Sequence, residues 1–548
     1  MKKIVIILVA LLGFAACKEE EFLDLENPNN VTTDEALQNM TSLDAKLLVS
    51  SAYGDLQANG LYGRFGYFLF DHMSDELIVS TNSNNAALNQ IQTLTINPLS
   101  ESNRLYYGQL YRAIFKANTA INLLTATTSP NISEEDKLVR IAEARFLRGF
   151  FYFKLVTRYG GVPLEDGLEV LKSRSSERQV YDFVINDFKF ASENLADKNA
   201  TEVGRPTKGS ALAMLGKALL FSIDPENSGT AAEQGKYTEA YDALSKVEAQ
   251  GYVLMDEYLD NFTDVNEFND ESLFEVGFID ATGSDDVWSA NAAGNNETSF
   301  ISADYSGWGN SAPTKKMIEA YEGDGVTVTG TVNNIDRASI SVTDRERSDP
   351  RLFFTWWTPG EKFGSSEDFF WGDVPDKEAY ERVSNGYNAP TGGNLACRKF
   401  SRLNTNNFQE TAESGVNYRI LRFAEVLLLQ AEAALFKENP NPAEAIELMN
   451  RVRARPSVNM PPYGSAEVPE WPVSTTAQIF AALKHERQVE LAMEGKRLVD
   501  LFRWGDDIKE LSDVKTTYTR ATGRYLPIPK EQIDTNPLID PTNPAPDL

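Results

Sequence analysis

The stretch Glu486-Arg-Gln-Val-Glu-Leu-Ala-Met-Glu-Gly-Lys-Arg-Leu-Val-Asp-Leu-Phe-Arg-Trp504 is the most informative part of this sequence. The sequence predicts that it belongs to one long final helix over residues 476–504. Two of its acids stand at i,i+4 spacing, an arrangement that is mildly unfavourable by itself. Arginines at i,i+3 spacing are expected to offset this repulsion and to tie the helix to its neighbours. The predicted contacts are Arg487 with Glu490, and Arg497 with Glu494 and Asp500.

The acids of this stretch also permit a catalytic interpretation. Glycoside hydrolysis needs two carboxyl groups flanking the scissile bond, and Glu486, Glu490 and Glu494 could supply them. Three acids among matching arginines are far more often ion pairs. We therefore expect these carboxylates to have a structural role.

Outward from this stretch, amphipathic helical patterns occupy both ends of the chain. Leu-Gly and Tyr-x-x-Ala signatures in the paired helices are similar to tetratricopeptide repeats. Long insertions separate the pairs, so the sequence predicts an all-α dominated scaffold of tetratricopeptide-like helix pairs rather than a regular solenoid. The helical patterns cover residues 34–58, 105–126, 133–158, 210–222, 236–250, 418–437 and 443–454.

The middle of the chain has a different composition. Residues 260–410 are rich in Gly, Asn, Ser, Asp and aromatic residues, and they show few helical patterns. Short strand-like runs are expected at residues 273–278 and 351–357. This region is therefore predicted to be an irregular, loop-rich lobe with a few short strands.

The N-terminus is typical of a processed leader. Lys2 and Lys3 precede an uncharged apolar run, residues 4–16, that is too short to span a bilayer. Two alanines then precede Cys17, the pattern read by lipoprotein processing, although Phe14 stands where Leu is usual. We expect lipidation of Cys17 and a membrane anchor made of several acyl chains.

The predicted organisation is 1–16 signal peptide, 17–35 lipidated tether, 36–259 N-terminal helical scaffold, 260–410 ligand-binding lobe, and 411–548 C-terminal helical region with an extended tail.

Composition excludes several classes of function. Among 548 residues, 52 Lys+Arg against 80 Asp+Glu give a net charge of −28, so nucleic-acid binding is not expected. With only two histidines and two cysteines, the chain has almost no material for a His-rich metal site or a Ser-His-Asp triad. No cofactor is expected. A weak alternative is structural calcium held by Asp280, Asp285 and Asp286.

Four blocks near the C-terminus resemble the SusD/RagB family of nutrient-binding lipoproteins of Bacteroidetes. They are Tyr418-Arg-Ile-Leu-Arg-Phe-Ala-Glu-Val-Leu-Leu-Leu-Gln-Ala-Glu432, Leu448-Met-Asn-Arg-Val-Arg-Ala-Arg455, the stretch 486–504, and Tyr525-Leu-Pro-Ile-Pro529 followed by Asn536-Pro537. Weaker agreement extends upstream, but the last residues depart from the Gln-Asn-Pro-Gly-Tyr ending that is frequent in the family. The tetrad Lys18-Glu-Glu-Glu21 is similar to the surface-export signal of such lipoproteins.

The resemblance implies a function. It implies a lipid-anchored protein of the cell outer membrane that captures oligosaccharides and delivers them to a SusC-like TonB-dependent transporter, without bond chemistry. Three alternatives stay open: peptide cargo, as in RagB-like members; a surface glycoside hydrolase; and a protein–protein scaffold.

Neutral sugars are bound by flat aromatic rings together with polar side chains that hydrogen-bond their hydroxyls. The richest such stretch is 285–310, where the resemblance also places ligand contacts. A second is 61–89, and a third combines Trp356-Trp357 with Phe369-Phe370-Trp371. For every ring the competing interpretation is core packing, which we favour for Trp356 and Trp357. The predicted ligand-binding residues are Trp288, Tyr305, Trp308, Phe300, Asn291, Asn296, Tyr67 and Asn82.

Overall fold

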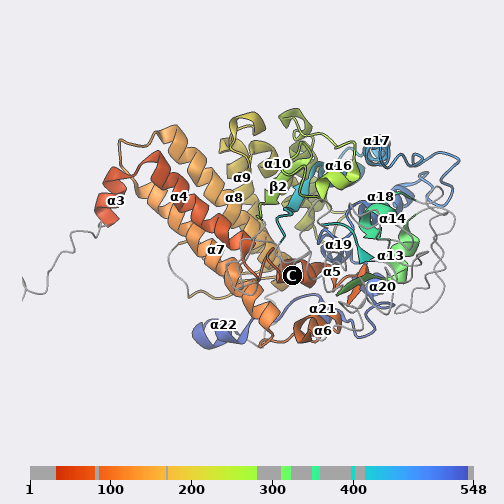
Figure 1. Cartoon of the computed structure of the whole chain (residues 1–548), viewed down its shortest axis with the longest axis horizontal. Helices are drawn as coiled ribbons and strands as arrows, with labels where there is room; N and C mark the ends of the chain where they lie inside the picture. Colours follow the sequence, from red (N-terminus) through yellow and green to blue (C-terminus); the bar gives the residue numbers. More distant parts are fainter. Residues whose placement is uncertain are drawn as a thin grey trace, which may run out of the picture.

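The computed structural model describes residues 33–79, 85–167, 171–279, 310–321, 349–357, 396–400 and 414–540. Its main feature is an array of antiparallel helices in which each packs on the next (Figure 1). Contacts run in turn through α7 to α11, then from α11 to α16 and α17, so the array continues across the middle of the chain. The members are α4 (Ser42–Tyr53), α7 (Glu101–Ala126), α8 (Glu134–Tyr159), α9 (Glu177–Asn194), α10 (Lys208–Phe221), α11 (Ala231–Leu244), α16 (Phe423–Phe436), α17 (Pro442–Arg453) and α18 (Thr476–Glu490).

Local sequence explains where these helices begin. The side chain of Ser133 accepts a hydrogen bond from the backbone N–H of Asp136 at 3.1 Å, as expected of an N-cap. Ser176, Thr207 and Thr475 each close a capping box with the residue three positions on. The helix expected over 133–158 is therefore confirmed as α8 (Glu134–Tyr159), and Gly160, with φ of 64°, follows its end.

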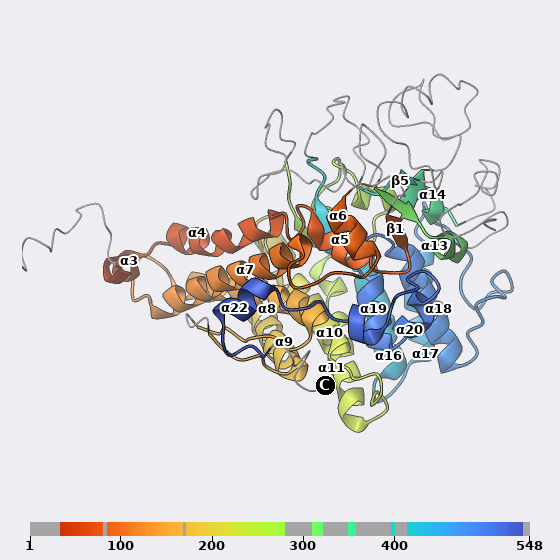
Figure 2. The ribbon, with the colours of Figure 1, turned by 90° about the horizontal axis from the view of Figure 1, so that it is seen from below.

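The remaining helices are short, and many surround the C-terminal part of the array (Figure 2). They are α3 (Thr33–Asn39), α5 (Phe65–Asp71), α6 (Ala86–Gln92), α13 (Lys315–Ala320), α14 (Arg351–Thr355), α19 (Arg497–Trp504), α20 (Asp507–Leu511), α21 (Arg520–Gly523) and α22 (Lys530–Thr535), with 3-10 turns at Gly54–Gln57, Lys198–Ala200, Glu248–Gln250 and Tyr258–Asn261.

The strands form antiparallel pairs that join distant parts of the chain. In the described residues, β1 (Leu77–Val79) pairs with β3 (Ser311–Pro313), and Ile78 stands opposite Ala312. β2 (Ser272–Val276) pairs with β6 (Tyr418–Arg422), with irregular register. β4 (Trp356–Trp357) pairs with β5 (Ala396–Cys397). The prediction of a helical scaffold with a few short strands is confirmed.

Three expected elements differ from the structure. The stretch 476–504 is two helices, because the chain turns at Met493 and Gly495, whose φ angles are 62° and 69°. Residues 418–422 form strand β6 rather than the start of a helix. Residues 351–355 form helix α14 rather than a strand, with the Asp349 carboxylate accepting the Arg351 backbone N–H at 2.9 Å.

Close helix packing depends on small residues. A Cβ added at Gly216 on α10 would lie 2.5 Å from Cγ of Leu244 on α11, so the glycine permits the observed approach of these helices.

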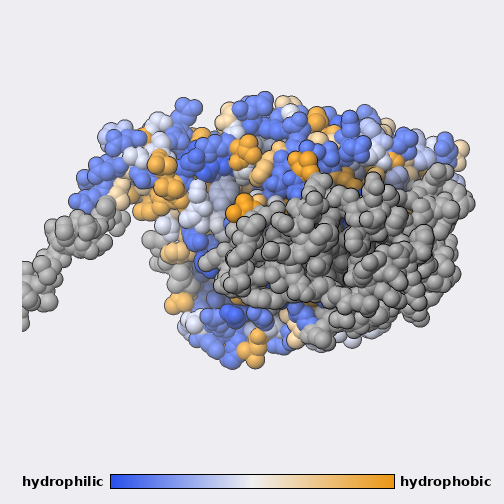
Figure 3. Space-filling model, viewed as in Figure 1, coloured by the Kyte–Doolittle hydropathy of each residue, from blue (hydrophilic) through white to orange (hydrophobic). Residues whose placement is uncertain are grey.

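Among the described residues, no helix is both long and apolar enough to cross a membrane. The coloured part of the face drawn in Figure 3 is mainly hydrophilic, and its hydrophobic residues lie in small separate groups.

Candidate ligand-binding site

Most of the predicted ligand-binding residues lie outside the described part of the chain. They are Asn82, Trp288, Asn291, Asn296, Phe300, Tyr305 and Trp308; Cys17 also lies outside it. Tyr67 is described, and its assignment is wrong. It lies on α5 with 2% of its surface exposed, and its ring centroid is 4.3 Å from that of Phe68. Tyr67 is therefore a core residue, because α5 is covered on all sides.

The structure brings two of the three candidate stretches together. Strand β1 belongs to the stretch 61–89, and β3 directly follows residues 285–310. Beside this strand pair, His72 and Ser311 share a hydrogen bond of 2.8 Å between side chains. The backbone N–H of Thr314 donates to the carbonyl of Glu76 at 2.8 Å. The described ends of the two aromatic-rich stretches are thus fixed to each other.

The third candidate stretch reaches the same place. Strand β5 contacts β3 as well as pairing with β4, so the three short strands lie together. In Figure 2, β1, β5, α13 and α14 gather on one side of the molecule. Trp356 has 0% of its surface exposed, which confirms its prediction as a packing residue. Three stretches that are far apart in sequence therefore begin or end on one side of the fold.

A buried acidic segment, residues 71–76, directly precedes strand β1. The Asp75 carboxylate receives two bonds of 2.9 Å from the Arg497 guanidinium and lies 3.1 Å from Nζ of Lys316. Burial raises the pKa of Asp71 to about 7, although the N–H of Gly495 donates to its carboxylate at 2.9 Å. Burial also raises the pKa of Glu76 well above its usual value, and the neighbouring Asp71 and Asp75 add to this effect.

Burial lowers the pKa of two basic groups beside this acidic segment. Burial, together with the nearby Lys515, lowers the pKa of His72 to about 3. Burial lowers the pKa of Lys515 to about 7. The Lys515 ammonium donates to the carbonyl of Leu77 at 3.1 Å and to the Gln92 side chain at 2.8 Å. The base of the candidate site is therefore a fixed, hydrogen-bonded network.

The acids of the stretch 486–504 form a buried ion-pair cluster with arginines from other elements. Glu486 lies 2.5 Å from Arg351, and Glu490 lies 2.6 Å from Arg422. Glu494 is bound by Arg422 at 2.8 Å and by Lys399 at 2.9 Å. The cluster ties the C-terminal helices to α14 and β6, as expected.

The individual partners were predicted wrongly. Arg487 binds Asp500 at 2.7 Å instead of Glu490, and Arg497 binds Asp75 instead of Glu494. The local i,i+3 spacing was misleading because these side chains are buried and pair with groups on other elements: Asp75 precedes β1, and Glu490 is bound by Arg422 of β6.

The cluster has the wrong properties for general acid catalysis. Glu486, Glu490 and Glu494 have at most 2% of their surface exposed, so no substrate reaches them. Burial alone would raise the pKa of Glu486, but the guanidinium groups of Arg351 and Arg453 lower it to about 2. A general acid needs a raised pKa. These carboxylates are structural.

The described residues contain no group of three or more His, Cys, Asp and Glu side chains that could hold a metal ion. The calcium candidates Asp280, Asp285 and Asp286 lie outside those residues, so that expectation stays a prediction.

Two family models match the sequence of this chain. A family model described as "SusD family" matches residues 270–545, half of the chain, and one described as "Starch-binding associating with outer membrane" matches residues 21–220. SusD-like protein P25 of Formosa agariphila is 25% identical over 98% of both chains. A SusD-like protein of Bacteroides ovatus is 28% identical over 50% of both chains.

Solved structures share the fold. A SusD-like carbohydrate binding protein from Bacteroides fragilis has a TM-score of 0.73 and 23% identity, covering 92% of this chain and 100% of its own. Surface glycan-binding protein A of Bacteroides thetaiotaomicron, solved with laminarihexaose, has a TM-score of 0.68 and 20% identity, covering 90% of this chain and 98% of its own. The fold is thus a helical scaffold shared with surface binding proteins. The chain belongs to the SusD family.

Proposed function

We propose that this protein is a surface lipoprotein that captures neutral oligosaccharides and delivers them to a SusC-like TonB-dependent outer-membrane transporter, without cleaving them. The observation that carries the proposal is that the described ends of three aromatic-rich stretches lie on one side of the fold, at strands β1, β3, β4 and β5. Family membership and the carbohydrate-binding proteins of the same fold support it.

The chemistry of capture follows from the residues in these stretches. Trp288, Tyr305 and Trp308 offer rings for the apolar C–H faces of sugars, and Asn291 and Asn296 offer both donors and acceptors to hydroxyl groups. The net charge of −28 disfavours anionic cargo, so neutral glycans fit the protein best. Glu486, Glu490 and Glu494 are held in the buried ion-pair cluster, so we assign them no catalytic role.

Delivery and anchoring complete the proposal. Acylation of Cys17 would hold the protein at the membrane, with residues 17–35 as a tether. The match of residues 21–220 to a family described as associating with the outer membrane supports that location.

Polysaccharide retention tests the proposal. The purified protein is run in native gels containing laminarin, starch, xylan or galactomannan, and its mobility is compared with that in a plain gel. We expect retardation by at least one polysaccharide, and loss of it in the double variant Trp288→Ala/Trp308→Ala. Phe115→Ala is the matched control, because Phe115 is 45% exposed on α7, outside the candidate stretches.

A second measurement separates binding from hydrolysis and from peptide capture. Incubation with the same polysaccharides should release no reducing ends, and release would establish an enzyme. Retardation by none of the glycans, together with binding to a peptide library, would replace glycan cargo with peptide cargo.

A further inference from the structure

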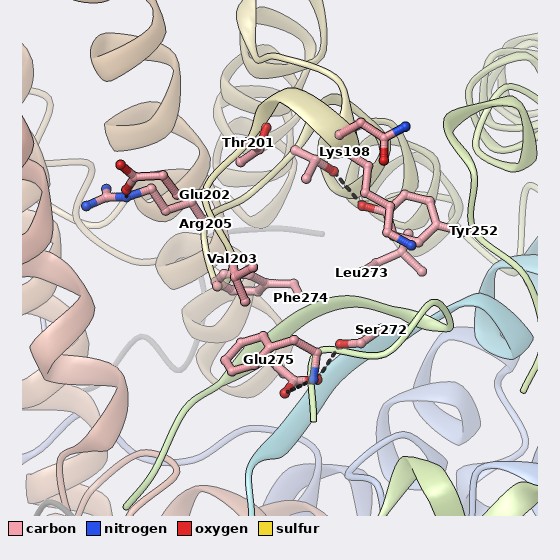
Figure 4. A pocket seen from close by; sticks show the side chains of 14 residues that line it. Lys198, Thr201, Glu202, Val203, Arg205, Tyr252, Ser272, Leu273, Phe274 and Glu275 are labelled. Carbon is pink, nitrogen blue, oxygen red and sulfur yellow. Dashed lines mark hydrogen bonds and ion pairs between the residues drawn. The ribbon is translucent and has the colours of Figure 1, made fainter. Parts of the chain in front are cut away.

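A hollow in the helical scaffold is lined by aromatic, apolar and polar side chains. It has a volume of about 160 Å³ and lies between the loop that joins α9 to α10 and strand β2. Figure 4 shows residues 198–205 on one wall and residues 272–275 on the other. None of these residues belongs to the three stretches predicted to bind ligand.

The exposed ring of Phe268 lines this hollow. Phe268 has a φ of 52°, the left-handed region that a bulky residue rarely adopts because of steric strain. Three other bulky residues in the described chain share this conformation, namely Leu94, Phe400 and Met493, with 8%, 0% and 1% of their surface exposed. Their burial stabilises the strained backbone. Phe268 is 38% exposed, so of these four residues it gains the least packing energy to offset its backbone strain.

The ring of Phe268 is held in place on both sides. A Cβ added at Gly204 would meet its Cε1 at 3.4 Å, and a Cβ at Gly277 would meet its Cζ at 3.4 Å. Its backbone N–H donates to the Glu275 carboxylate at 2.9 Å. Glu275 is itself fixed by the Asn417 amide at 2.8 Å. The fold thus maintains a rigid, strained and partly exposed ring, and strain of this kind is typical of functional sites.

Polar side chains share the lining of the hollow with this ring. Asn199 is exposed on the opposite wall, Lys198 is anchored there by Asp270 at 2.7 Å, and Glu202 is held by Lys46 at 2.7 Å and by Arg205 at 2.9 Å. Tyr252 lies below Lys198, whose ammonium is 4.6 Å from the ring centroid. The side chain of Val203, 79% exposed, forms an apolar rim. A flat ring with an apolar rim and neighbouring amide and ammonium groups matches the faces and edges of a pyranose.

We infer that this hollow binds one sugar unit of a neutral glycan, with Phe268 as the stacking platform and Asn199 as the hydroxyl partner. The inference rests on the proposed function, because it extends glycan binding to a second place on the same protein. Its volume suits a single ring rather than a chain, so its role is to add a contact for long glycans that are also held elsewhere.

Replacing the ring tests the inference in the full-length protein. In the same polysaccharide gels, Phe268→Ala should weaken retention about three- to tenfold, the range expected for loss of one ring contact. Phe268→Trp should retain binding because it keeps a flat ring. Phe115→Ala, which removes a ring of similar exposure from α7, should leave retention unchanged. Thermal unfolding of each variant establishes that the fold is intact.

The outcomes separate the two proposals. If the unaltered protein is retained and Phe268→Ala is retained equally, the second site is wrong and the proposed function stands. If Phe268→Ala loses binding while Trp288→Ala/Trp308→Ala does not, the hollow is the main site. If the unaltered protein is retained by no polysaccharide, the proposed function fails and the inference fails with it.

Discussion

The guanidinium of Arg422 binds the carboxylate of Glu494 with two parallel hydrogen bonds, each 2.8 Å long, although 72 residues separate them in sequence. The same guanidinium also donates to Glu490 at 2.6 Å and to Glu271 at 2.9 Å. Arg422 is 1% exposed, so three carboxylates depend on this buried cation. It joins strand β6 to the turn after α18.

Replacing Arg422 should therefore be strongly destabilising. Arg422→Met leaves the buried Glu494 without its main cation and removes one partner from Glu490 and Glu271, and we expect the free energy of unfolding to fall by about 3–5 kcal/mol. Arg422→Lys should recover little of this loss, because one ammonium cannot make the paired bonds. Urea unfolding followed by circular dichroism measures both.

The exposed pair Lys46 and Glu202 supplies the control for this experiment. Its charged atoms are 2.7 Å apart, but 37% and 53% of the two side chains are exposed. Lys46→Ala should change the free energy of unfolding by less than about 1 kcal/mol. Equal effects of Lys46→Ala and Arg422→Met would contradict the importance of burial.

Close packing of α10 on α11 predicts opposite effects for two glycine substitutions. Gly216→Ala places a Cβ against buried Leu244 and should lower the free energy of unfolding by about 1–3 kcal/mol. Gly235→Ala, within α11, has no atom within 4 Å of the new Cβ and should raise stability by about 0.5–1 kcal/mol. Thermal unfolding of the two variants side by side tests the pair, and a stable Gly216→Ala protein would show that the helices can separate.

The raised pKa of Asp71 predicts a pH dependence of stability. The folded carboxyl keeps its proton up to about pH 7, whereas in the unfolded chain it ionises near its ordinary pKa of 3.8. Folding therefore takes up a proton between these values, and stability decreases as pH rises through this window, by up to about 1.4 kcal/mol per pH unit. Asp71→Asn cannot ionise, and its side-chain oxygen can still accept the Gly495 N–H.

The measurement is the urea midpoint of both proteins at several pH values in this window. The slope with pH should be smaller in Asp71→Asn. Part of it should remain, because burial also raises the pKa of Glu165 and of Glu267 to about 7. An identical slope in both proteins would show that Asp71 is ionised in the folded state.

The lipid anchor is tested at its predicted cysteine. Cys17→Ala, expressed in a Gram-negative host and labelled with a fatty-acid analogue, should lose both the label and its place in the membrane fraction. Cys397→Ala is the control, since Cys397 lies buried on β5 and should not affect labelling. Retention of the label by Cys17→Ala would move the modification elsewhere.

The helical scaffold could be predicted because its signals are local. Capping residues and apolar spacing define α7 and α8 within a few residues of the expected bounds. Strand β6 gave no such signal: all five of its residues are buried, so it lacks the alternation of a half-exposed strand. The turn at Met493 was equally hidden, because only Gly495 marks it in the sequence.

The candidate site could be predicted only as a set of segments. Tyr67 and the rings of the middle region look alike in sequence, since aromatic residues serve both cores and binding surfaces. The strained conformation of Phe268 was also invisible, because φ is fixed by the surrounding turn and by Glu275 rather than by residue type.

The bond between Asp75 and Arg497 spans 422 residues and so has a consequence for how the chain is made. Synthesis supplies the first partner long before the second, while the helix hairpins can form early from near neighbours. Premature termination anywhere before position 497 would leave Asp75 without its guanidinium. This ion pair can therefore form only after residue 497 has been synthesised, so it cannot contribute to the stability of earlier folding intermediates on the ribosome.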